Sequence, residues 1–275
     1  MNTDSRIIRE FVELGKVDDC PVFDTHAHYG PYKAIHMPKW RPEQILHTMD
    51  RCGVTWMIIS GHQAFADTER GNREVAELVA SHPDRFLGYW VINPNYPERV
   101  EKELAEYDSQ RGFVGFKFHP SGHGYPLTGD RYRPALEYAN ERGLAILSHT
   151  WTGKGMCGPD EVRQVAEQYP NVRLLMGHSC HAQFREAGEI ARDFENVYCE
   201  LCAAYAMRGS IELMAEHAGS RKILFGTDHP WFDHHYGIGC VIFARLTDED
   251  RRNILYRNAE RLFADHIGPR AGTEQ

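Results

Sequence analysis

The feature that most constrains this chain is a short apolar segment followed by an amphipathic helix, repeated along almost its whole length. Segments with the continuous apolar and β-branched character of buried strands begin near residues 22, 54, 86, 113, 144, 172, 197 and 222. They recur every 25 to 32 residues, roughly the spacing of single strand–helix units. Strict alternation over 275 residues favours an α/β fold of the (β/α)8 type, a single-domain TIM barrel, over an open doubly wound sheet.

Amphipathic stretches predict the helices between these strands. A proline in the first turn and a glycine just past the end mark such a helix, as at Pro42 and Gly53. The expected helices cover residues 41–53, 72–81, 97–107, 132–142, 159–169, 184–194, 210–217 and 248–263. We expect residues 1–20 to form an N-terminal extension with a short helix from Arg6 to Leu14, and residues 21–275 to form the barrel domain. The first strand is not followed by a glycine-rich phosphate loop, which argues against dinucleotide binding.

Composition narrows the expected partners and location. The net charge is −8 and Lys and Arg do not cluster, so we expect no nucleic-acid partner. Neither a membrane-spanning apolar run nor a signal peptide is recognisable, so we expect no membrane association. Seven cysteines without a disulfide framework predict reduced thiols and a cytoplasmic location. Cys199 and Cys202 form a CxxC pair, but no second pair accompanies it, so we do not expect a zinc ribbon.

Two histidines, His26 and His28, close the first predicted strand. Side chains alternate along a strand with period two, so both imidazoles leave it in the same direction. Two imidazoles presented side by side can hold one metal ion, although a pair of surface or core histidines would give the same pattern. The other strand ends therefore decide how this pair is interpreted.

Metal-ligand and acid–base residues recur at the ends of further strands. Functional side chains of a TIM barrel sit at the carboxyl ends of its strands. The residues expected there are His26, His28, Lys117, His119, His149, His178 and Asp228. Histidine nitrogens with one carboxylate suit zinc, and also iron, manganese or cobalt. The sequence therefore predicts a metal centre at the mouth of the barrel.

Loop residues could complete the mouth or simply pack against it. The set includes His62, Asn93, His123, Trp151, His229, Trp231, His234 and His235. We expect Trp151, two residues after His149, to wall the substrate side, and residues 233–236 to form a surface-loop cluster. Glu200, on the seventh strand, either faces the pocket or is buried with a partner beside the eighth strand.

Several motifs together resemble the amidohydrolase superfamily. They are Asp24-Thr25-His26-Ala27-His28, Gly115-Phe116-Lys117-Phe118-His119-Pro120, Ser148-His149, Gly177-His178-Ser179 and Gly226-Thr227-Asp228-His229-Pro230. More narrowly, they resemble the branch that includes aminocarboxymuconate-semialdehyde decarboxylase and many TIM-barrel metal-dependent hydrolases. The resemblance extends from about residue 22 to residue 263, where the closing helix is also similar to that branch.

The resemblance implies a role for each matching residue. His26, His28 and His149 would bind the metal, and Asp228 would complete the site and take a proton from a metal-bound water. His178 would polarise the substrate and orient the water, or bind a second metal. The resemblance favours a single divalent ion, zinc first, with iron, manganese or cobalt as alternatives.

Lys117 and its neighbours leave two interpretations open. In binuclear members of the superfamily a lysine on the fourth strand is carboxylated and bridges two ions, which we consider the less favoured state here. Otherwise Lys117 is an ammonium that binds a substrate carboxylate or pairs with Asp24. His119 and Trp151 are likewise expected to serve a second metal or the substrate.

The expected function is that of a metal-dependent hydrolase acting on a small-molecule amide, lactone or ester. The alternative is a metal-dependent lyase, a decarboxylase or hydratase of a small unsaturated or aromatic carboxylic acid. Resorcylate-type decarboxylases tend to carry a carboxylate where His26 stands, so the HxH pair slightly favours hydrolysis. It does not exclude decarboxylation, because the muconate-type decarboxylase keeps HxH. A TatD-like nuclease is disfavoured because Lys117 replaces the strand-four glutamate of that group. A metal-binding protein without catalysis is disfavoured because the ligand set is intact. A homodimer is left open by analogy with relatives.

Overall fold

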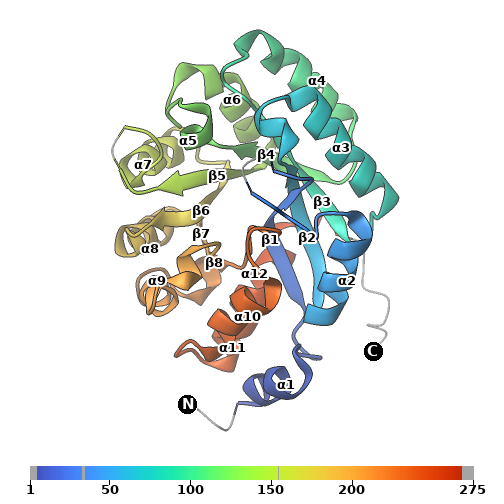
Figure 1. The fold of residues 1–275 in the computed structure, drawn as a ribbon. Coiled ribbons are helices and arrows are strands. Elements are labelled where there is room, and N and C mark those ends of the chain that lie inside the picture. Colours follow the sequence, from blue (N-terminus) through green and yellow to red (C-terminus); the bar gives the residue numbers. More distant parts are fainter. Residues whose placement is uncertain (1–4, 33–34, 154, 268–275) are drawn as a thin grey trace.

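Eight parallel strands form one sheet in sequence order, with helices packed around its outside (Figure 1). The computed structural model describes residues 5–32, 35–153 and 155–267. The strands are β1 Val22–Tyr29, β2 Val54–Gly61, β3 Phe86–Val91, β4 Phe113–Phe118, β5 Ala145–Trp151, β6 Arg173–His181, β7 Val197–Glu200 and β8 Ile223–Leu224. The predicted (β/α)8 TIM barrel with a single domain is confirmed.

The helices follow the strands around the barrel. They are α1 Arg6–Leu14, α2 Pro42–Cys52, α3 Thr68–Ser81, α4 Val100–Ser109, α5 Pro120–His123, α6 Arg133–Arg142, α7 Pro159–Gln168, α8 Phe184–Asp193, α9 Ser210–Ala218, α10 His234–Phe243, α11 Asp248–Arg252 and α12 Asn258–Leu262. None of the helices in these described ranges is long and apolar enough to cross a membrane.

The barrel closes between its first and last strands through single backbone contacts. The amide of Thr25 donates to the carbonyl of Phe225 at 2.9 Å, and the amide of Asp228 donates to the carbonyl of His26 at 2.7 Å. One isolated bridge joins Ala27 to His229. These contacts place the segment after β8 directly beside the end of β1.

Two apolar clusters hold the barrel together. A larger one fills the space between the strands and the surrounding helices. A smaller one fills the lower interior, where Phe23 and Tyr89 from the strands meet Tyr256 and Phe263 from the last helical segment. Because the bottom is filled in this way, polar side chains pointing inward collect at the opposite, carboxyl ends of the strands.

The structure corrects the expected helix pattern near the C-terminus. Residues 233–236 do not form a surface-loop cluster: Asp233 caps α10, its carboxylate accepting from the amide of His235 at 2.8 Å, and the His234 side chain is fully buried. The sequence of α10 is apolar on all sides, so no amphipathic period marks it. The last helix is also divided, by a π-helical turn at Asn253–Arg257.

Candidate metal and active site

Three side chains from the joined ends of β1 and β8 form a group of metal-ligand type. In His26, His28 and Asp228, one ligand atom of each lies within 4.8 Å of the other two. The Nε2 atoms of His26 and His28 lie 3.4 and 2.8 Å from Oδ1 of Asp228. Both imidazoles of the HxH pair thus reach the same carboxylate, as the period of the strand predicts.

A buried carboxylate, that of Asp24, ties the two segments of this group together. Its Oδ1 accepts from the amides of His26 at 3.0 Å and Thr227 at 3.1 Å. Its Oδ2 accepts from the Thr227 hydroxyl and from Nε2 of His234 at 3.0 Å. Asp228 follows with a backbone φ of 64°, an unfavourable value for a non-glycine residue that persists only where surrounding contacts enforce it.

The contacts of His26 define its tautomer. Its Nδ1 lies 2.8 Å from Oε2 of Glu200 and donates to that carboxylate. Its Nε2 then has a free lone pair, which accepts from the amine of Lys117 at 2.8 Å. Burial, and next the nearby Lys117 charge, hold the pKa of His26 well below its ordinary value. His26 is therefore neutral, as a metal ligand must be.

The contacts of His28 leave either tautomer open. Its Nδ1 lies 2.9 Å from the hydroxyl of Ser60, which can donate or accept. In the arrangement seen, Nε2 of His28 faces Asp228. If that nitrogen releases its proton to bind a cation, Nδ1 can carry a proton and donate to Ser60 instead.

Lys117 and Glu200 form a buried charged pair on either side of His26. Burial lowers the pKa of Lys117 and raises that of Glu200, while each charge acts to favour the ionised form of the other. The expected alternative pairing of Lys117 with Asp24 is wrong, because the Lys117 amine bonds to His26 and Asp24 is held by Thr227 and His234. Glu200 is fully buried, with His26 as its partner.

His149 borders the same cavity but lies outside the close donor group of His26, His28 and Asp228. Its ring is stacked between His119, at 4.3 Å and 12°, and Trp151, at 5.5 Å and 7° between planes. Trp151 in turn stacks on His181 at 4.0 Å. Burial holds the pKa of His149 well below its ordinary value, so this ring is also neutral.

The His178 ring lies near the predicted ligands on β5 and β1. Its centroid is 4.6 Å from that of His149 and 5.1 Å from that of His26. Its Nδ1 donates to the carbonyl of Cys202 at 3.2 Å, which leaves a lone pair on Nε2. Burial lowers the pKa of His178 to about 4. The ring can therefore accept a proton or bind a cation, but it does not act as an imidazolium.

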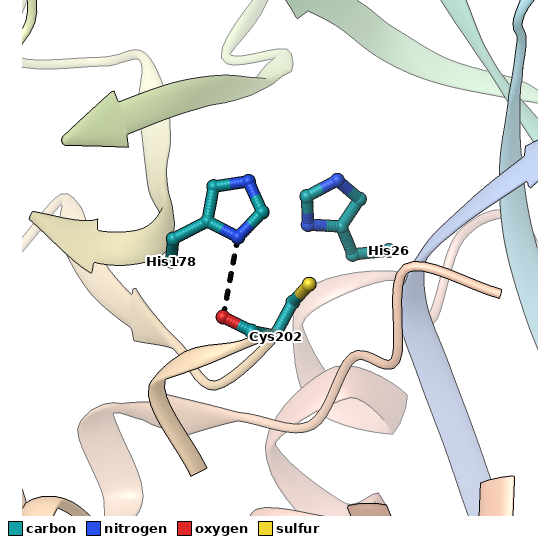
Figure 2. A group of neighbouring side chains, drawn as sticks. All are labelled: His26, His178 and Cys202. Atoms are coloured by element: carbon teal, nitrogen blue, oxygen red, sulfur yellow. Dashed lines mark hydrogen bonds between the residues drawn. The ribbon is translucent and has the colours of Figure 1, made fainter. Parts of the chain in front are cut away.

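Cys202 is a functional candidate that sequence reasoning missed, as it missed the cavity-lining residues Tyr32, Phe65 and Phe232. With His26 and His178 it forms a second group whose ligand atoms lie within 4.8 Å of one another, and Figure 2 shows the thiol turned toward the two imidazoles. The CxxC spacing is the sequence feature that points to this thiol, but the two cysteines of the pair lie in different environments. Cys199 packs in the apolar core, whereas Cys202 lies past the end of β7.

A cavity of about 320 Å³ opens above these groups. Its walls are aromatic, and it is lined by His26, His28, Tyr32, His62, Phe65, Lys117, His119, His149, Trp151, His178, Ala203, Asp228, Trp231 and Phe232. Of the proposed loop residues, His62, Trp151 and Trp231 line it, with the Trp231 indole donating to Nε2 of His62 at 2.9 Å. Asn93, His123, His229, His234 and His235 are not in this lining; Asn93, for example, donates to the carbonyl of Phe65 at 3.1 Å.

The donor chemistry of the site fits a divalent cation. His26 and His28 are nitrogen donors, and Asp228 supplies a carboxylate. Burial acts to raise the pKa of Asp228, but the hydrogen bond from His28 helps to hold it well below its ordinary value. Two nitrogens and one oxygen suit zinc, manganese, iron and cobalt alike.

The chain is similar to known decarboxylases in sequence and to solved TIM-barrel proteins in fold. A curated gamma-resorcylate decarboxylase of Polaromonas sp. is 24% identical over 78% of this chain and 85% of that protein. An uncharacterized TIM-barrel protein of Bordetella bronchiseptica has a TM-score of 0.75 and 15% identity, over 90% of this chain and 99% of that one. A dihydroxybenzoic acid decarboxylase of Polaromonas sp., solved with manganese and 2-nitroresorcinol, has a TM-score of 0.72 and 16% identity, over 90% and 98%.

The prediction of a hydrolase of amides, lactones or esters is wrong. Further curated relatives are also named decarboxylases, which agrees with the alternative and not with hydrolysis. The HxH pair does not discriminate between the two reactions, because the same donors that would activate water can hold a carboxylate. Which bond breaks depends on the cavity that surrounds the donors, and a ligand motif does not encode that.

The family assignment rests on a match to almost the whole chain. The family model described as Amidohydrolase matches residues 23–264, from the first strand of the barrel into the segment that closes its floor. This chain therefore belongs to the amidohydrolase family.

Proposed function

We propose that this chain is a metal-dependent decarboxylase of a small aromatic or unsaturated carboxylic acid. The carrying observation is the donor group His26, His28 and Asp228 at the base of a cavity with aromatic walls. A bound divalent cation would neutralise the substrate carboxylate and draw it toward the donors. The single zinc ion expected from the sequence stays part of this proposal, beside the manganese held by the similar decarboxylase.

The walls of the cavity suit a planar ring. Phe65, Trp151 and Trp231 present aromatic surface, which stacks favourably on unsaturated groups. His119 adds one polar contact: its Nδ1 accepts from the amide of Gly122 at 2.9 Å, so its Nε2 carries the proton. That proton makes His119 a donor to a substrate oxygen, and we favour this role over that of a second-metal ligand.

Decarboxylation needs a proton at the carbon that loses carbon dioxide. Asp228 is the carboxylate of the donor group that reaches the cavity, with 15% of its side chain exposed. Because its pKa lies low, it rests as a carboxylate and must first take up a proton from solvent. As the bond between the substrate carbon and its carboxylate breaks and carbon dioxide leaves, this proton replaces the carboxylate on that carbon. We propose that Asp228 passes this proton to the substrate carbon, while Nε2 of His178 accepts a hydrogen bond from a substrate hydroxyl.

The test is release of carbon dioxide from hydroxybenzoic and unsaturated acids by the purified protein, with its metal content determined by elemental analysis. We expect turnover with a bound divalent ion, and a loss of at least about 100-fold in kcat for Asp228→Asn. An exposed control, Asp84→Asn, should retain full activity. Hydration of the acid without carbon dioxide release, or unchanged turnover in Asp228→Asn, contradicts the proposal.

A further inference from the structure

A second donor group lies beside the first and contains a thiol. His26, His178 and Cys202 are all buried, and their ligand atoms lie within 4.8 Å of one another. Three points so spaced share a centre no more than about 2.8 Å from each, since 4.8 Å divided by √3 is 2.8 Å. Zinc binds nitrogen at about 2.0 Å and sulfur at about 2.3 Å. Shifts of less than about 1 Å would therefore close this group around an ion.

The backbone on both sides of Cys202 holds the thiol in this position. Its amide donates to Oε1 of Glu200 at 2.8 Å, and its carbonyl accepts from Nδ1 of His178 at 3.2 Å. The same Glu200 carboxylate accepts from Nδ1 of His26 at 2.8 Å. One buried glutamate thus fixes two members of the group and supplies negative charge beside it, as the carboxylate partners of metal ligands do.

We propose that His26, His178 and Cys202 form a second metal position, selective for soft divalent ions such as Cd²⁺. Thiolate sulfur prefers soft ions, whereas the carboxylate of Asp228 in the neighbouring group suits harder ions such as Mn²⁺. Binding breaks the S–H bond of Cys202, and the released proton leaves for solvent as the sulfur–metal bond forms. This position does not depend on which reaction the protein catalyses.

Charge makes the two positions mutually exclusive. One divalent ion and the Lys117 ammonium would be balanced by the carboxylates of Asp228 and Glu200 and the thiolate of Cys202. A second divalent ion would leave two uncompensated charges in a buried site, which is strongly unfavourable. The groups also share His26. A soft ion therefore displaces the hard one.

Cadmium titration of the purified full-length protein tests this proposal. We expect an ultraviolet sulfur-to-cadmium charge-transfer band that saturates at one ion, and a cadmium NMR resonance in the range of sulfur coordination. Cys202→Ser should abolish both and weaken Cd²⁺ binding at least about 100-fold, because loss even of an outer partner of a metal ligand costs 10- to 100-fold. Cys199→Ala, in the same CxxC pair but in the apolar core, should retain the band.

Two further measurements separate this site from the proposed active site. His28→Ala removes a ligand of the first group and should retain the sulfur–cadmium band. Excess Mn²⁺ should lower the apparent Cd²⁺ affinity by competition. Absence of the sulfur–cadmium band in the wild-type protein overturns the proposal, and this result does not depend on whether any variant folds. A band that survives in Cys202→Ser overturns it as well. Neither result bears on whether the protein releases carbon dioxide.

Discussion

The indole of Trp151 lies parallel to the imidazole of His149, with 7° between the planes and 5.5 Å between the centroids. The resemblance implies that His149 is the third metal-binding histidine, and we keep that role as a prediction although the ring lies outside the close donor group. Metal-binding histidines usually donate their second nitrogen to a carboxylate or carbonyl, which fixes the ring. Within the described residues no such hydrogen bond to the His149 ring is found. The stack of His119, His149, Trp151 and His181 therefore takes over the positioning of His149.

Replacement of Trp151 by leucine should loosen His149 and weaken metal binding. An aromatic pair contributes about 0.5–1.5 kcal/mol, so we expect the Kd for Mn²⁺ to rise by about 3- to 10-fold in titration calorimetry. Trp151→Phe, which keeps a ring to stack, should restore most of the affinity. Trp40→Leu is the control, since Trp40 packs against Tyr29 away from this cavity. Equal affinity in Trp151→Leu and wild type would refute a positioning role.

Replacement of Lys117 by methionine should tighten metal binding. The Lys117 amine occupies the lone pair of His26 Nε2 and would repel a cation nearby. Two unit charges about 4 Å apart interact by about 4 kcal/mol near a protein surface, so even a partly relieved repulsion should lower the Kd by about 10-fold or more. Lys102→Met, on the exposed face of α4, controls for the change in net charge. A weaker metal affinity in Lys117→Met would instead favour a carboxylated lysine as ligand.

Asp24→Asn should destabilise the fold. The Asp24 carboxylate accepts four hydrogen bonds, from two amides, the Thr227 hydroxyl and His234, and an asparagine NH₂ group would face some of these donors. Breaking such a buried charged cluster costs about 3–5 kcal/mol, which urea unfolding should detect as a lower midpoint. Asp84→Asn, at an exposed loop position, should leave the midpoint unchanged. Equal urea midpoints for the two variants would show that the Asp24 hydrogen bonds do not contribute to the stability of the fold.

The pH dependence of stability should reveal Glu103, a buried carboxyl on α4 that accepts a hydrogen bond from the Thr68 hydroxyl. Burial raises its pKa to about 7. The folded state therefore binds this proton more tightly than the unfolded state, and stability falls as pH rises from the ordinary glutamate pKa toward 7. Glu103→Gln removes that loss while keeping an oxygen for Thr68.

In urea unfolding, Glu103→Gln and the wild type should have similar free energies of unfolding near pH 4. By pH 8 the variant should be more stable by about 3 kcal/mol, since the pKa is raised by about 2.5 units and one unit corresponds to about 1.4 kcal/mol. Glu101→Gln, at an exposed position of the same helix, should track the wild type at both pH values. A variant less stable than the wild type at pH 8 contradicts this account.

The sequence determined the barrel, because each strand and most helices carry their own local pattern. The eight expected strand starts lie within one residue of those in the structure, from Val22 to Ile223. It also determined that His26 and His28 point the same way, since that follows from the period of one strand. The helix α10 was not visible, because an apolar segment without amphipathic period gives no helical signal.

Only the tertiary structure decided which side chains meet. Contacts such as Lys117 with His26, or Cys202 with His26 and His178, join residues far apart in the chain, and their distances depend on barrel closure and on backbone angles after each strand. Sequence reasoning gave Cys202 little weight because a lone CxxC pair does not show which thiol faces a cavity. The prediction of hydrolysis was wrong because the reaction depends on the shape of the cavity. The motifs specify the types of metal ligand, whereas the cavity is formed by loops that only the fold brings together.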